Sequence, residues 1–178
     1  MGGLIVQKYL ESHEVPAALL IAPCPAMGGT LGLLVRYTMD QLWPALTATY
    51  GRKTAIQDQA MCRRLFFDQI SPEKLEAHFN RLGLESSRAI RNMVLPLFKV
   101  KAKKITSTPV AVAAGGRDYL FEFKMLQKWA TDFDYDFLPF PEAAHNLLSE
   151  PEAFAFGETT CTWLDQKTTG ADAPVGAL

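Results

Sequence analysis

The hydrophobic and polar positions between residues 108 and 151 predict a strand, a helix, a second strand and a loop, in that order. The apolar run Pro109–Ala114 is followed by two glycines, as expected of a strand buried on both faces of a sheet. Apolar side chains recur at intervals of three and four over Phe121–Phe133, the spacing of an amphipathic helix. Tyr135–Pro139 is predicted to be the second strand, and His145 lies in the loop beyond it.

A carboxylate and an imidazole follow these two strands. Asp118 comes directly after the first strand and His145 after the second. In a right-handed crossover both strands point the same way, so both side chains would emerge at one edge of the sheet. There they can form the orienting acid and the base of a nucleophilic hydrolase. Asp118 could instead be a turn-forming aspartate, and His145 an ordinary loop histidine, but their shared register favours the catalytic interpretation.

The N-terminal residues predict another helix and another strand. The helix over Gly3–Glu11 is apolar around most of its circumference, so we expect it inside a layered fold, packed on a sheet. Val15–Ala22 is predicted to be the next buried strand. Together with the later crossover, this alternation of helices and strands predicts a parallel α/β sheet.

Residues 28–104 contain no convincing strand and several helical patterns. A helical block between two strands of one sheet is expected to be an insertion that forms a lid over the strand ends. The division predicted is core (1–27), helical cap (28–104), core (105–166) and flexible tail (167–178). The predicted helices are Thr30–Met39, Leu42–Tyr50, Ala55–Asp68, Ser71–Leu82, one from Ser86 or Ser87 through Met93, and a closing helix Glu150–Leu164. Trp43, Phe66, Phe67 and Phe79 are expected to line the core of the lid.

Composition narrows the function classes. A net charge of -1 gives no electrostatic reason to expect nucleic acid as a partner. The three widely spaced cysteines predict neither a disulfide framework nor a metal site, and we expect a reducing, cytoplasmic location with no cofactor. No apolar run approaches the length of a membrane span. Cys24 is a poor candidate for a nucleophile because it lies in a loop between two prolines.

Four short motifs resemble the C-terminal part of an α/β-hydrolase of the single-domain esterase, lipase and haloperoxidase type. Met1–Leu4 resembles the residues that follow the nucleophile in the family's G-x-S-M-G-G elbow. Ile21–Pro25 resembles the strand and loop before the family's helical cap. Gly115–Asp118 resembles the strand end that carries the catalytic acid, and Ala144–Asn146 the loop with the histidine. The resemblance covers Met1–Leu164 and is carried by the order of the motifs.

This resemblance implies an incomplete α/β-hydrolase fold, with a partial parallel sheet of three strands flanked by helices and a helical cap insertion. It implies that Asp118 and His145 are the acid and base of a triad, and that the backbone amide at Met1 is an oxyanion donor. The family's serine directly precedes this methionine, so we expect the 178 residues to lack the nucleophile and to be inactive. The expected origin is a truncated gene model, with a natural short product ranked second. An upstream targeting segment would then be missing too. The intact parent would hydrolyse a small ester or related acyl substrate.

Two further hypotheses remain open. The chain could be a non-catalytic remnant that binds a ligand or a partner, with self-association through an exposed sheet edge at Ala17–Ala22. Alternatively, the intact parent could use an aspartate nucleophile, as dehalogenases and epoxide hydrolases of the family do. The sequence does not identify the substrate.

Overall fold

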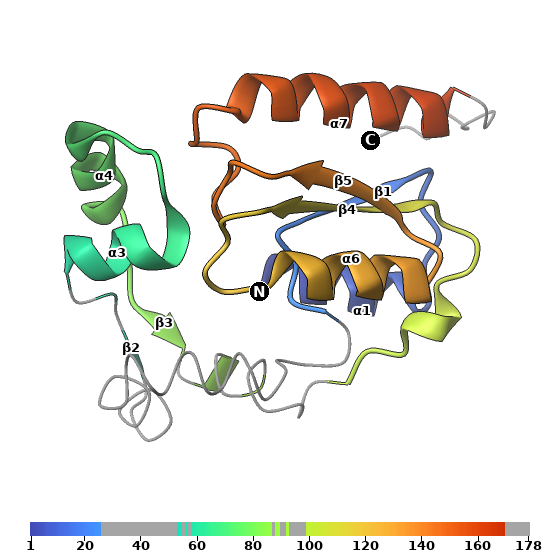
Figure 1. The fold of residues 1–178 in the computed structure, drawn as a ribbon. Coiled ribbons are helices and arrows are strands. Elements are labelled where there is room, and N and C mark those ends of the chain that lie inside the picture. The colour runs from blue at the N-terminus through green and yellow to red at the C-terminus, as the bar shows by residue number, and fades with distance from the viewer. Residues whose placement is uncertain are drawn as a thin grey trace, which may run out of the picture.

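The computed structural model describes residues 1–25, 53–54, 56, 58–86, 88–89, 92 and 99–169. In Figure 1 a sheet lies between layers of helices, and two cap helices stand beside the ends of its strands. In chain order the elements are α1 (Gly2–Leu10), β1 (Ala18–Ile21), β2 (Lys53–Thr54), α3 (Gln59–Phe66), α4 (Pro72–Phe79), β3 (Glu85–Ser86), the 3-10 turn η1 (Ala102–Lys104), β4 (Val110–Gly115), α6 (Phe123–Asp132), β5 (Asp136–Phe140) and α7 (Ala153–Thr168).

The central sheet is parallel and has the strand order β1-β4-β5. Strand β4 is the middle strand and is buried along its whole length, as its uninterrupted apolar run predicts. Strand β1 pairs with one edge of β4, with Ala18 opposite Val110, and β5 pairs with the other edge, with Ala113 opposite Leu138. The predicted three-stranded parallel sheet flanked by helices is therefore confirmed.

Alternate residues of β4 face two different hydrophobic layers. Val110, Val112 and Ala114 pack in a cluster with buried residues of α1 and α6, such as Leu4 and Leu126. Ala113 faces the other way and packs in a cluster that contains Phe140 and Phe156. Figure 1 shows the same arrangement, with α1 and α6 on one face of the sheet and α7 on the other. Both faces of β4 are thus covered, which explains why its sequence does not alternate.

Helix α1 differs from the prediction in one respect. Its buried residues, Leu4, Gln7 and Leu10, lie on one face, whereas Ile5 is 58% exposed and Tyr9 is 51% exposed. The helix packs on the sheet as predicted, but the sheet buries only part of its apolar surface. The physical reason is that β1, the strand beside α1, is an edge strand of the described sheet, so the sheet covers only one side of the helix.

The described part of the cap contains the helix pair α3 and α4. The side chain of Asp58 accepts a hydrogen bond from the amide of Met61 at the start of α3, and that of Ser71 accepts one from Lys74 at the start of α4. Ser71 was predicted as a cap, while α3 begins later than predicted because Asp58 caps it. Cys62, Phe67, Ile70 and Leu75 form the small core of this pair, with Ile56, Phe66 and Phe79 packed at its edge.

The expectation that residues 28–104 contain no strand was wrong. Strands β2 and β3 pair antiparallel over two residues each, with Lys53 opposite Ser86. Strands this short carry no periodic pattern, so their sequences give no signal. The predicted helices Thr30–Met39 and Leu42–Tyr50, together with Trp43, lie outside the described residues.

Helix α7 closes the second face of the sheet. Gly157 lies inside it without interrupting it, and the helix continues to Thr168, beyond the predicted end at Leu164. The indole nitrogen of Trp163 donates a hydrogen bond of 2.7 Å to the carboxylate of Asp136, which fixes α7 to the first residue of β5. Among the described residues, none of the helices has the length and apolar character needed to cross a membrane.

Candidate active site

Asp118 lies three residues past the end of β4, in the turn that leads to α6. Its side chain is completely buried. Oδ1 accepts hydrogen bonds from the backbone amides of Leu120, at 2.7 Å, and Phe121, at 3.1 Å. A short side chain that accepts amide hydrogen bonds two and three residues ahead stabilises a turn. The turn-forming interpretation of Asp118 is therefore correct, but the turn uses only one of the two carboxylate oxygens, Oδ1.

The second oxygen of Asp118 faces His145. Oδ2 lies 2.8 Å from Nδ1 of His145, although the two residues are 27 positions apart in the sequence. An ionised carboxylate only accepts hydrogen bonds, so a neutral His145 donates from Nδ1. This leaves Nε2 without a proton and able to accept one. The His145 side chain is 21% exposed, so the pair is largely shielded from bulk water while part of the imidazole remains accessible.

Residues 116–122, which contain Asp118 (the acid turn), approach residues 141–152, which contain His145 (the histidine loop), because two glycines allow their backbones to come close. A Cβ atom at Gly115 would lie 2.4 Å from the carbonyl oxygens of both Ala143 and Ala144. A Cβ atom at Gly116 would lie 2.2 Å from the carbonyl oxygen of Pro141. The amide of Arg117 donates a hydrogen bond of 2.9 Å to the Ala143 carbonyl. The Gly115-Gly116 pair is thus needed for the backbone approach that brings His145 to Asp118.

Two aromatic rings flank the imidazole of His145. The ring centroid of Phe121 lies 5.7 Å from that of His145, and the centroid of Phe66 lies 5.9 Å away. Phe121 comes from the acid turn and is buried, while Phe66 is the last residue of cap helix α3. The core and the cap therefore each contribute an apolar wall beside the imidazole of His145.

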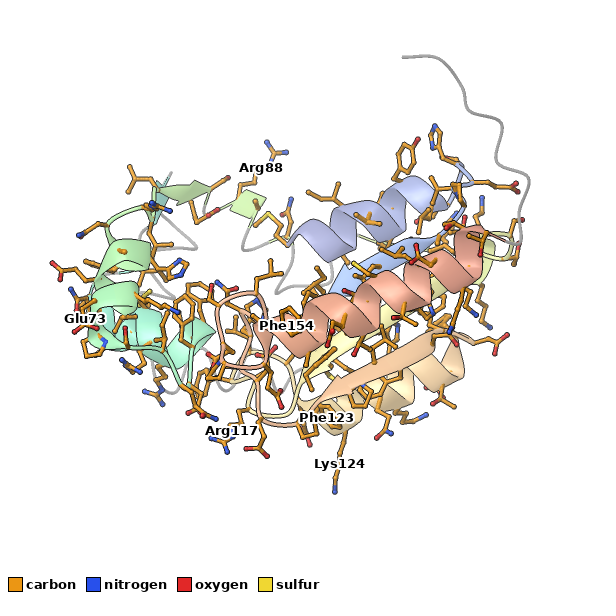
Figure 2. The ribbon with its side chains drawn as sticks, turned by 90° about the horizontal axis from the view of Figure 1, so that it is seen from above. Glu73, Arg88, Arg117, Phe123, Lys124 and Phe154 are labelled. Atoms are coloured by element: carbon orange, nitrogen blue, oxygen red, sulfur yellow. The ribbon has the colours of Figure 1, made fainter. Side chains whose placement is uncertain are left out.

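The cap is joined to the core by polar contacts around this point. Arg117 donates a hydrogen bond of 2.6 Å to Asp68 of the cap and also pairs with Glu142 of the histidine loop. Figure 2 shows Arg117 on the surface between the cap helices and the core. The amide of Asn146 donates to the carbonyl of Phe66 at 2.9 Å, and buried Glu150 accepts from two cap amides. Neither Arg117 nor Glu150 was predicted as part of the site, because nothing local in the sequence distinguishes them from other surface charges.

Met1 and Cys24 lie close to one another at the start of α1. Figure 1 places the N-terminal end of α1 on the side of the sheet where β4 and β5 end. Burial raises the pKa of the Cys24 thiol to about 11, and the positive amino terminus nearby opposes part of this rise. Its Sγ lies 3.8 Å from the carbonyl oxygen of Pro25. A neutral, buried thiol is a poor nucleophile, as expected for Cys24.

The described residues bring together the carboxylate of Asp118 and the imidazole of His145. Among them, no side-chain hydroxyl or thiol forms a hydrogen bond with Nε2 of His145. The same residues contain no group of three or more His, Cys, Asp or Glu side chains that could hold a metal ion. The chemistry available from these residues is proton transfer at His145, with Asp118 holding the ring and stabilising its protonated form.

Comparison with known proteins relates this geometry to solved structures. No model of a known protein family matches the sequence, and no curated protein matches it. The chain superposes with a TM-score of 0.63 on a monoacylglycerol lipase from Paleococcus ferrophilus, at 15% identity over 93% of this chain and 65% of the other. An esterase from Exiguobacterium antarcticum gives the same TM-score at 18% identity, over 92% of this chain and 63% of that one.

A third similar structure is a soluble variant of the monoglyceride lipase of Saccharomyces cerevisiae, solved in complex with a substrate analogue. It matches with a TM-score of 0.63 and 17% identity, over 93% of this chain and 62% of the lipase. The chain therefore spans a little under two thirds of the length of each of these three proteins. At such low identity these similarities describe the backbone fold, and the chemistry of the site must be argued from its own geometry.

Proposed function

From its incomplete α/β-hydrolase fold, we propose that this chain carries the acid and base of a serine hydrolase that acts on an ester or related acyl substrate. The observation that carries the proposal is the 2.8 Å contact between Oδ2 of Asp118 and Nδ1 of His145. These two residues come from separate loops that follow adjacent parallel strands. A structural ion pair would satisfy the carboxylate equally well, but it would not require a partly exposed imidazole whose Nε2 has no hydrogen-bond partner among the described residues.

In the proposed reaction each group has one role. Nε2 of His145 removes the proton from a hydroxyl as that oxygen attacks the acyl carbon, and later returns a proton to the leaving group. Asp118 holds the ring by its Nδ1–H and stabilises the imidazolium that forms. We further propose that the backbone nitrogen at Met1 is an oxyanion donor, a role in which it must be an amide and so requires a preceding peptide bond. We propose that the nucleophile is a residue preceding Met1, and we therefore expect the 178 residues alone to have no esterase activity.

The same proposal assigns the other parts of the chain. We assign residues 1–27 and 105–166 to the core, together with the last turn of α7 up to Thr168, residues 28–104 to a cap over the substrate, and the residues after α7 to a tail. The substrate is a small acyl compound, and Phe66 and Phe121 offer it an apolar wall next to His145. We propose a cytoplasmic location because Cys24, Cys62 and Cys161 are all free thiols.

The proposed acid–base pair is tested by the protonation state of His145. Nitrogen-15 NMR of the chain at a pH where the ring is neutral distinguishes the Nδ1–H from the Nε2–H tautomer. We expect mainly Nδ1–H, and a shift toward Nε2–H in Asp118→Asn, whose amide group presents a donor to the ring. His13→Ala and His78→Ala assign the other two histidine signals. A wild-type His145 that is mainly Nε2–H would contradict the proposal.

A different nucleophile would change the reaction class. The pair formed by Asp118 and His145 would also serve an enzyme that opens epoxides or removes halides, in which an aspartate attacks carbon and the histidine activates water for the second step. The residue that precedes Met1 in the gene product decides between the two. A serine there supports acyl transfer, and an aspartate supports the alternative.

A second candidate function is a non-catalytic module that associates with a copy of itself. It is favoured by apolar side chains exposed on the edge strand β1 and on helix α1: Ile21 is 38% exposed, Ile5 58% and Tyr9 51%. We propose that a second copy pairs along β1, because an unpaired strand edge is a template for another strand. Sedimentation velocity should then detect a dimer that Ile21→Lys weakens. A monomer at all concentrations would argue against this function.

A further inference from the structure

The cap residues Phe66–Gln69 form three hydrogen bonds with the loop between β5 and α7 that carries His145. The carbonyl of Phe66 accepts a hydrogen bond from the amide of Asn146, directly after His145. The amides of Asp68 and Gln69 both donate to the carboxylate of Glu150. Three successive polar contacts therefore connect one short cap segment to one short loop of the core.

Glu150 makes the most unusual of these contacts. It is only 3% exposed, and its two carboxylate oxygens accept from two consecutive amides, Oε1 from Asp68 at 2.8 Å and Oε2 from Gln69 at 2.9 Å. A buried carboxylate needs such charge-assisted hydrogen bonds to offset the loss of water. No lysine, arginine or histidine is paired with Glu150 in the described structure, so the two cap amides are its principal partners there.

The segment that Glu150 fixes is also the one that touches the base. The centroid of the Phe66 ring lies 5.9 Å from that of the His145 ring, on the cap side. The Phe66 carbonyl also accepts a hydrogen bond from the amide of Asn146, the residue that follows His145. Phe121 contacts the same imidazole from the acid turn, at 5.7 Å. His145 is therefore confined by the Asp118 carboxylate, by the core and by a cap segment whose place depends on Glu150.

We propose that Glu150 is a positioning residue for His145, which acts by anchoring the cap segment Phe66–Gln69 against the histidine loop. This inference rests on the proposed function, because it assigns a role in holding the proposed base. It also makes the C-terminal end of α3 a fixed part of the site. This part of the cap then does not move away from the core as a lid would. Because Phe66 would then keep a constant position, its ring would contact the acyl group of the substrate and help to select it.

The inference is tested with Glu150→Gln, which keeps the size of the side chain but replaces one acceptor oxygen by a donor group that faces an amide N–H. Hydrogen exchange at the amides of Asp68 and Gln69 should become at least about tenfold faster, since a hydrogen bond to a charged group is lost. The fraction of His145 in the Nδ1–H tautomer, measured by nitrogen-15 NMR, should fall. The matched control is Glu158→Gln on the exposed surface of α7, which should change neither quantity.

The outcomes separate this inference from the proposed function. If the wild-type chain lacks the Nδ1–H tautomer, the acid–base pair itself is refuted. If the wild-type pair is present but Glu150→Gln leaves the tautomer unchanged, Glu150 has only a structural role and the inference fails, even when the cap amides exchange faster. Should Glu150→Gln not fold, Glu150→Asp and Phe66→Leu test the anchor and the ring contact separately. A tautomer unchanged in both would overturn the inference.

Discussion

The substitution Gly115→Ala tests the packing of the histidine loop on the acid strand. Gly115 is the last residue of β4, and an added methyl group would lie 2.4 Å from the carbonyl oxygens of both Ala143 and Ala144. The nearest approach that real Cβ atoms make is about 3.0 Å, so strand and loop would have to separate by about 0.6 Å. Neither obstacle is a flexible side chain that could turn away, because both are backbone atoms in a buried loop.

The expected cost follows from the overpacking of a rigid interior. Extra methyl groups forced into a packed core destabilise proteins by about 1–3 kcal/mol. For a chain of this size each kcal/mol lowers the melting temperature by about 2–4 °C, so Gly115→Ala should lower it by about 2–12 °C. The displaced loop carries His145, and the fraction of its Nδ1–H tautomer should fall at the same time.

The matched control is the same substitution in α7. A methyl group at Gly157 would meet no atom within 4 Å, and alanine is favoured over glycine in a helix by about 0.5–1 kcal/mol. Gly157→Ala should therefore raise the melting temperature measured by circular dichroism, while Gly115→Ala lowers it. If the two variants melt alike, or if Gly115→Ala is the more stable, the proposed contact between strand and loop is wrong.

Three further substitutions test the core, a buried thiol and the attachment of α7. Leu126→Ala removes a side chain with no exposed surface and should lower the free energy of unfolding, measured with urea, by about 2–5 kcal/mol; a loss below 1 kcal/mol would contradict the packing of α6 on β4. Burial raises the Cys24 pKa from 9.0 to about 11, so the unfolded chain releases this proton first as the pH rises. The stability contributed by the neutral thiol is present below pH 9 and should be lost between pH 9 and 11, a loss absent from Cys24→Ala and of about 3 kcal/mol at most. Trp163→Phe deletes the hydrogen bond to Asp136 and should cost about 0.5–1.5 kcal/mol by urea titration, whereas Trp163→Phe in an Asp136→Ala background should cost less.

The core of this fold could be predicted from the sequence because its signals are local. Strand β4 is an uninterrupted apolar run that ends in glycines, and α6 has regular apolar spacing, so both were found close to their observed bounds. The parallel crossover rule then places Asp118 and His145 at one sheet edge, and the structure brings them to 2.8 Å. In each case a short segment carried the information.

The remaining features depend on contacts between distant segments. The exposure of Ile5 and Tyr9 follows from the position of β1 at the edge of the described sheet, which no pattern within α1 reveals. Glu150 reads as an ordinary acidic residue before a helix, and only the folded cap shows that it binds amides more than 80 positions away. Burial of a charge is a tertiary property, so composition and periodicity gave no warning of it.

The central claim is that Asp118 and His145 serve a serine nucleophile that precedes Met1. The most direct test is to read the codons upstream of Met1 in the gene and to assay the resulting longer protein for hydrolysis of p-nitrophenyl acetate. The account predicts an in-frame Gly-x-Ser directly before Met1, activity in the longer protein, and loss of that activity in His145→Ala. An in-frame stop codon, a residue other than serine at that position, or full activity in His145→Ala would contradict it.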